Sequence, residues 1–297
     1  MKQLFLLTLT LLILFFTNTN QGYAQLQEGL SLSHSYFPKD ESIGIQKSEI
    51  GYFTSFGLNE QGSSILLGGH YTFSLFDFDE DKYPAVSTSK LEEFHTLSLQ
   101  VGYRTSIGAD WTVMGLVMPY FSSTLNDDFD LQRNDFGVDG IIMFTKGNPA
   151  SYLTLGLAYS TQSGLPFPIP IISYHNTINK SWDYTLGVPQ FDLNFHATSR
   201  SSFQSFIKLD GVMGNIRESV LADYPGVKSQ FAQYSIIGGL GYNFKLSKSI
   251  SFSVEGGYTL GHFLFIQKNE IKIPPKELYD FDTDNKLYLN AGLRIGI

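Results

Sequence analysis

Regular alternation of apolar and polar side chains is the feature that most constrains how this chain can fold. From Leu97 to Tyr103 every second residue is apolar, and after a polar turn the alternation resumes from Trp111 to Val117. A period of two places successive side chains on opposite faces of a sheet, so this stretch predicts a β-hairpin with one apolar and one mixed face. Comparable segments recur to the end of the chain, which indicates an all-β fold.

The first 24 residues have the features of an export signal. Lys2 precedes an almost unbroken apolar run, Leu4–Phe16, and the small residues Gly22 and Ala24 come just before Gln25. We therefore expect a signal peptide over residues 1–24 and one mature domain over residues 25–297. The alternative, an uncleaved anchor helix, would need ~20 apolar residues, more than this run supplies. A lipoprotein is not expected, because no cysteine lies near the cleavage point.

The composition restricts the class of protein further. There is no cysteine, so neither disulfides nor thiolate metal sites can hold the exported chain together. Charged residues make up 16% and aromatic residues 15%, which suits a chain that turns one face of its strands to lipid. The net charge of −8 argues against a nucleic-acid partner. The expected partners are outer-membrane lipid, lipopolysaccharide and the barrel-insertion machinery.

Counting the alternating segments predicts a transmembrane antiparallel up-and-down β-barrel of about 14 strands with both mature termini in the periplasm. The count depends on a break at Pro189, because proline cannot donate a hydrogen bond within a central strand; 12 or 16 strands remain open. The other possibility is a soluble secreted β-sandwich, whose strands are usually shorter. The expected strands are 30–36, 49–58, 66–76, 94–104, 111–121, 136–144, 152–160, 169–175, 182–188, 191–196, 203–210, 234–244, 250–264 and 287–297.

Aromatic pairs flank the short turns between several of these strands. The two members of each pair are eight positions apart, which suits an aromatic girdle at the periplasmic edge of the membrane. The pairs are Tyr103 and Trp111, Phe144 and Tyr152, Tyr174 and Trp182, and Phe195 and Phe203.

The polar positions of the strands define the expected lumen. Opposite charges there could line a wet pore or form a network across the lumen. Met114, Leu116 and Met118 are expected to point into the lumen as well. They could form an apolar path for a ligand or pack against a plug. The predicted lumen-lining residues are Glu49, His70, Gln100, Arg104, Asp139, Asp183, Asp192, Asn194, His196, Lys208, Asp210, Glu255 and Arg294.

Two other kinds of chemistry find little support. Asp77, Asp79 and Asp81, and again Asp280, Asp282 and Asp284, begin a calcium-loop pattern, but the turn glycine and the bidentate glutamate are missing. Loose divalent-ion binding stays a hypothesis. A barrel hydrolase would need a histidine beside a serine or a carboxylate on one face, and Asp192 and His196 are ~13 Å apart along a strand. No catalytic, cofactor-binding or metal-binding residue is predicted.

Short motifs along the chain resemble one family. They are 94–97 (FHTL), 111–115 (WTVMG), 156–159 (GLAY), 166–168 (PFP), 170–172 (PII) and 255–258 (EGGY). Together they resemble an uncharacterised family of outer-membrane β-barrel proteins of Gram-negative bacteria, a domain of unknown function. The resemblance implies a barrel in the outer membrane and supplies no site residues. Such barrels commonly end on an aromatic residue, whereas this chain ends on Ile297.

The sequence therefore predicts a porin-like channel or transporter for small molecules, with no cofactor and an unknown cargo. The alternatives are a plugged structural or surface-interaction barrel and, third, a barrel-embedded hydrolase.

Overall fold

The computed structural model describes residues 28–296, apart from residues 41, 61, 109, 125–130, 161–166 and 271–275. The predicted signal peptide, the acidic loop 126–130 and Ile297 lie outside the described residues. Among the described residues, no helix has the length and hydropathy needed to cross a bilayer.

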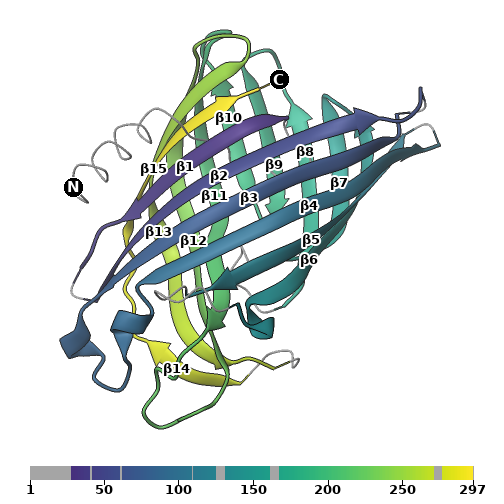
Figure 1. Ribbon diagram of the computed structural model, residues 1–297. Helices are drawn as coiled ribbons and strands as arrows, with labels where there is room; N and C mark the ends of the chain where they lie inside the picture. The colour runs from purple at the N-terminus through teal and green to yellow at the C-terminus, as the bar shows by residue number, and fades with distance from the viewer. Residues whose placement is uncertain are drawn as a thin grey trace.

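The described chain is built from strands and three short 3-10 helices (Figure 1). The strands are β1 (Gly29–Phe37), β2 (Ile43–Gly57), β3 (Ser64–Phe78), β4 (Glu93–Ile107), β5 (Trp111–Ser123), β6 (Phe136–Asn148), β7 (Ser151–Tyr159), β8 (Ile169–Thr177), β9 (Trp182–Val188), β10 (Phe191–His196), β11 (Ser201–Ile216), β12 (Ser229–Lys245), β13 (Ile250–Lys268), β14 (Glu277–Phe281) and β15 (Leu287–Ile295). The 3-10 helices are η1 (Glu80–Lys82), η2 (Thr88–Lys90) and η3 (Arg133–Asp135).

Within the described residues, the strands close into one antiparallel ring. Each of β1–β13 pairs with the next, and β15 joins β13 to β1. β14 lies outside the ring and pairs only with an extension of β13. The predicted barrel of 14 strands is confirmed, as is the break at Pro189, because β9 ends at Val188 and β10 begins at Phe191.

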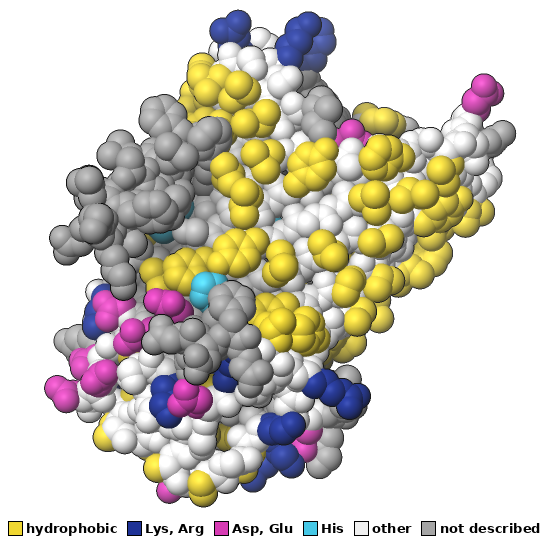
Figure 2. Space-filling view, in the orientation of Figure 1, with side chains coloured by type: hydrophobic (Ala, Val, Ile, Leu, Met, Phe, Trp, Pro, Cys, Tyr) yellow, Lys and Arg dark blue, Asp and Glu magenta, His cyan; other side chains and the backbone are white. Residues whose placement is uncertain are grey.

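The outer face of the ring carries the apolar side chains of the alternation. On β4, Leu97, Leu99 and Val101 are each about half exposed, whereas Ser98 between them is buried. Figure 2 shows hydrophobic side chains spread over the middle of the visible face, with most charged side chains at its lower end and a few at its upper end. An apolar band between polar ends is the surface that a barrel presents to a membrane.

The short turns at one end of the barrel share one local structure. A side-chain oxygen at the start of the turn accepts hydrogen bonds from the backbone amides two and three residues later, which stabilises the reversal of the chain. Asn148 does this between β6 and β7, Asn179 between β8 and β9, Thr198 between β10 and β11, and Ser247 between β12 and β13. The start of β1 and the end of β15 lie at this same turn end.

Most of the predicted aromatic girdle lies on the outer face near the turn end, with Tyr103, Trp111, Phe144, Tyr174, Trp182 and Phe203 exposed. Tyr152 is the exception, and its predicted place in the girdle is wrong. It is adjacent to the exposed Leu153, so the alternation turns it inward, where it lines a cavity and stacks on His175 with ring centroids 4.7 Å apart.

Several strands run further toward the other end, the loop end, than the sequence predicted. β2 begins at Ile43 instead of Glu49, and β11 continues to Ile216 instead of Asp210. The segments left outside the expected strands between residues 36 and 49 and between residues 210 and 234 are therefore partly strand, and the expected bounds of those strands are wrong. The cause is long-range pairing, since Ile43 pairs with Phe78 and Ile216 pairs with Ser229.

The extension of β11 crosses the interior of the barrel. β10 accompanies β11 only as far as Ile207, and beyond that point β11 bends to meet β5, with Asn215 opposite Ser123 in parallel pairing. We call this contact the seam. Side chains of β2 and β5 satisfy three carbonyls on the free edge of β11. The carbonyl of Gly211 accepts from Lys47 Nζ (3.2 Å), that of Met213 from Ser122 Oγ (2.9 Å) and that of Asn215 from Ser123 Oγ (3.2 Å).

The seam creates a smaller ring at the loop end, formed by β1–β5, β11–β13 and β15. A ring of roughly eight strands has an interior that side chains can fill. Here it is filled by a cluster of buried apolar residues, the core cluster, in which the Phe231 ring lies 4.8 Å from the rings of both Phe76 and Phe94. The main body of the core cluster is Phe37, Ile43, Ile45, Phe76, Phe78, Phe94, Phe206, Val212, Ile216, Phe231, Ile237, Leu264, Ile266 and Phe281.

A polar contact fastens the loops above this core. The buried Lys286 donates to the carbonyl of Ile43 (2.7 Å) and pairs with Asp40. Burial alone would raise the pKa of Asp40, but hydrogen bonds from Lys286, Ser42 and the backbone lower that pKa well below its usual range.

Replacing Phe231 with alanine tests the core cluster. The Phe231→Ala variant should lower the free energy of unfolding by about 3–5 kcal/mol, because it leaves a cavity at a fully buried position. The matched control is Leu240→Ala on the same strand, whose side chain is 69% exposed. Thermal unfolding in detergent measures both, and equal losses would contradict a packed core at the loop end.

Candidate functional site

The first polar group of the lumen is centred on Lys47 of β2. Its Nζ lies 2.7 Å from Asp210 Oδ1 on β11 and 3.2 Å from Glu49 Oε1 on its own strand. Glu49 also accepts a hydrogen bond from Ser33 (2.5 Å), and His70 Nε2 lies 3.9 Å from its carboxylate. Because β2 and β11 are not neighbours in the ring, the Lys47–Asp210 pair spans the lumen.

A second polar group is centred on Glu255 of β13. Its Oε2 accepts hydrogen bonds from Lys208 (2.5 Å), Tyr288 (3.2 Å) and Asn290 (3.2 Å). The Lys208 Nζ also lies 4.8 Å from the centre of the Tyr288 ring. Every charge here has a partner, so this group holds β11, β13 and β15 together instead of presenting a free charge to a solute.

A third polar group lies on β9–β11. Asp192 accepts hydrogen bonds from Gln190 and Gln204, and Asp183 accepts from Asn194 (2.8 Å) and contacts His196. His196 is exposed at the turn end of its strand, whereas Asp192 is buried.

The remaining predicted lumen residues are spread over other strands. Gln100 is half-buried on β4, Asp139 is buried on β6, and Arg104 is exposed at the turn end of β4. Arg294 is buried and its Nη2 donates to the carbonyl of Glu28 (2.9 Å). The structure thus brings some predicted residues together and leaves others apart, and their role in lining a pore stays a prediction.

Sequence reasoning missed the residues at the centre of this network. Lys47 shares a strand face with Glu49, but it lies outside the expected strand 49–58 and has no predicted role. Tyr288 lies in the expected strand 287–297 but has no predicted role, and its hydroxyl joins the Lys208–Glu255 pair.

The histidines form cross-strand contacts that the sequence spacing does not reveal. His34 contacts Ser48 (3.0 Å), and the buried His262 contacts Ser235 (2.8 Å). Neither histidine has a hydrogen-bonded carboxylate among the described residues, which a serine-type triad would require. In the described part of the chain, no three His, Asp or Glu side chains are grouped so that they could hold a metal ion.

The structure also places the two acidic segments considered for calcium. Asp77 lies in β3 and pairs with Lys39 (2.7 Å), and Asp280 lies in β14. Neither triplet is a continuous loop, and the divalent-ion hypothesis stays a prediction.

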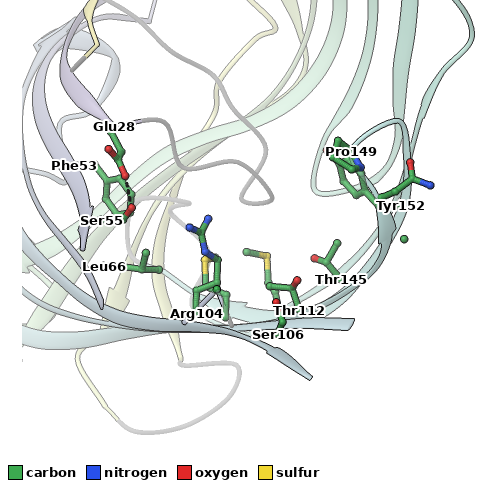
Figure 3. A pocket seen from close by; sticks show the side chains of 15 residues that line it. Glu28, Phe53, Ser55, Leu66, Arg104, Ser106, Thr112, Thr145, Pro149 and Tyr152 are labelled. Carbon is green, nitrogen blue, oxygen red and sulfur yellow. Dashed lines mark hydrogen bonds between the residues drawn. The ribbon is translucent and has the colours of Figure 1, made fainter. Parts of the chain in front are cut away.

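A cavity of about 430 Å³, which we call the vestibule, lies at the turn end of the barrel. Its lining combines apolar side chains of the lumen with hydroxyl and charged groups near the turns, and Figure 3 shows Arg104 pointing into the space between Ser55 and Thr145. The side chains that line it are Glu28, Phe53, Ser55, Leu66, Arg104, Ser106, Thr112, Met114, Met143, Thr145, Asn148, Pro149 and Tyr152.

The apolar part of the vestibule continues into the lumen as a buried cluster, the apolar lumen cluster. It comprises Phe53, Leu66, Met114, Leu116, Met118, Ile141, Met143, Ala158 and Ile171. The inward direction predicted for Met114, Leu116 and Met118 agrees with their burial. This cluster is separate from the core cluster. Most of its residues lie on β5–β8, nearer the turn end than the seam is.

Comparisons with known proteins agree with the resemblance found in the sequence. The chain matches the family model described as Domain of unknown function (DUF6268) over residues 45–296, and it belongs to that family. No curated protein matches the chain significantly.

Three solved structures are similar to this one. The COG4313 outer membrane channel from Pseudomonas putida F1 has 13% identity and a TM-score of 0.45, with 94% of this chain and 100% of that chain covered. The NanC porin has 10% identity and a TM-score of 0.38, covering 90% and 100%. The Pseudomonas putida toluene transporter TodX has 10% identity and a TM-score of 0.37, covering 92% and 89%.

Replacing Lys47 with methionine tests the network across the lumen. The Lys47→Met variant should lose about 3 kcal/mol of stability or more, because it leaves Asp210 and Glu49 without their cation inside the protein. The matched control, Lys146→Met, removes an exposed lysine at the turn end and should stay within about 0.5 kcal/mol of the parent.

A second substitution identifies the partner. Adding Asp210→Leu to Lys47→Met should restore part of the lost stability, which a double-mutant cycle of thermal unfolding in detergent measures. If Lys47→Met unfolds at the same temperature as Lys146→Met, the pair does not hold the two walls together.

Proposed function

We propose that this protein is an outer-membrane barrel that transports small molecules along a narrow path, closed at rest, with both mature termini in the periplasm. The observation that carries the proposal is the division of the barrel interior. The core cluster fills the ring at the loop end, whereas the vestibule and the apolar lumen cluster lie largely between the seam and the turn end.

The size and chemistry of the vestibule support this function. Small-molecule sites are concave, mostly apolar and about 300–1,000 Å³ in volume, with a few polar groups that fix the ligand's orientation. The vestibule has this volume, and Met114 and Met143 connect it to the apolar lumen cluster. Flexible methionine side chains adapt to passing ligands more readily than branched ones do.

A wide passive pore fits the interior less well. Barrels of 16–18 strands leave an aqueous channel, but here β11 crosses the lumen and its charges are paired. The second candidate function is a plugged structural barrel, which the buried core cluster favours. The two candidates differ in whether the apolar lumen cluster can be turned into a conducting path.

Conductance in planar bilayers separates them. The parent protein should show low, intermittent conductance, because apolar side chains exclude water and ions from the path. Replacing Leu116 and Met118 together with serine should raise the conductance several-fold by wetting the path. The matched control is Val117→Ser, between them on β5, whose side chain is 55% exposed on the outer face.

Two results would contradict the proposal. Steady large conductance of the parent would indicate an open porin. Silence of the Leu116→Ser, Met118→Ser double variant would indicate a structural barrel, provided that gel mobility shows the variant to be inserted as a folded barrel.

A further inference from the structure

The vestibule contains a cation whose charge the described protein leaves unpaired. Arg217 pairs with Asp135 (2.7 Å) and Arg294 donates to the Glu28 carbonyl (2.9 Å), but Arg104 forms neither an ion pair nor a hydrogen bond with a described residue. Alternation along β4 turns Arg104 inward, since Tyr103 beside it is exposed on the outer face. A guanidinium held this way presents several donors to an incoming ligand.

The surroundings of Arg104 favour a ligand with an apolar body. Leu66, Met114 and Met143 line the vestibule near it and belong to the apolar lumen cluster. Contact with these side chains removes apolar ligand surface from water and adds affinity.

Hydroxyl groups and one carboxylate complete the lining. Ser106, Thr112 and Thr145 lie around the cavity (Figure 3), and their hydroxyl groups can donate or accept a hydrogen bond. Glu28, hydrogen-bonded to Ser55, lies on the side of the cavity away from Tyr152 and Pro149. Its negative charge disfavours a second anionic group on the ligand.

We infer that the vestibule binds small molecules with one carboxylate on an apolar body, and that Arg104 binds the carboxylate. The inference rests on the proposed function, because it treats the vestibule as the place where a transported molecule is recognised. It predicts an order of preference in which a monocarboxylate binds better than its neutral amide and better than a dicarboxylate of the same length.

Calorimetric titration of the protein in lipid nanodiscs tests this order, with empty nanodiscs subtracted. The probes are hexanoate, hexanamide, adipate and hexylamine, which share a six-carbon chain. The parent should bind hexanoate about fivefold more tightly than hexanamide, because a charge-assisted hydrogen bond to an exposed arginine is partly screened by water. Adipate and hexylamine should bind more weakly than hexanoate.

Substitutions assign this preference to Arg104. Arg104→Gln should reduce hexanoate binding to the level of hexanamide and leave hexanamide binding unchanged, and Arg104→Lys should retain part of the preference. The matched control is Arg200→Gln, which makes the same change at the turn between β10 and β11, outside the vestibule lining. This control should bind all four probes as the parent does.

Three results would overturn the inference: Arg104→Gln that keeps the preference for hexanoate, a parent that prefers hexylamine, or a parent that binds none of the probes. The conductance of the Leu116→Ser, Met118→Ser variant does not depend on these ligands. A failure of ligand recognition is therefore distinguishable from a failure of the transport function.

Discussion

The rest of this structure depends on the requirement that backbone donors and acceptors find partners inside the protein. In a membrane, water cannot satisfy them, and a closed ring of strands is one of the few solutions. β1–β13 and β15 meet that requirement around the circumference. At one place the neighbouring strand is too short to pair with all of these groups, because β10 has six residues and its neighbour β11 has 16.

The free edge of β11 explains why the interior of the barrel is divided into two parts. Its carbonyls at Gly211, Met213 and Asn215 take their hydrogen bonds from side chains of β2 and β5, so the strand is drawn across the lumen. This crossing narrows the ring at the loop end until side chains can fill it, which is why a packed core exists in a barrel of this size. It also leaves the interior near the turn end to the vestibule and to the apolar lumen cluster, whose residues lie on β2, β3 and β5–β8.

Local sequence patterns predicted the number and order of the strands around the barrel, because alternation, strand length and turn residues are local properties. The break at Pro189 and the short turns between residues 144 and 152 and between residues 175 and 182 follow from these local patterns. The seam does not, because nothing near Ser123 or Asn215 specifies a partner 92 residues away. Lys47 lies in the part of β2 that is strand because it pairs with β1 and β3, so the local pattern did not indicate it. The inward direction of Arg104, in contrast, follows from alternation alone.

A chemical cross-link between β5 and β11 tests most directly whether β11 crosses the lumen. The chain has no cysteine, so cysteines introduced together at Ser123 and Asn215 would be the only two present. In folded protein inserted in a membrane, they should form a disulfide on mild oxidation, seen as altered mobility on a non-reducing gel. If the two strands lay on opposite walls of an open barrel, no disulfide would form, and the division of the interior would be contradicted.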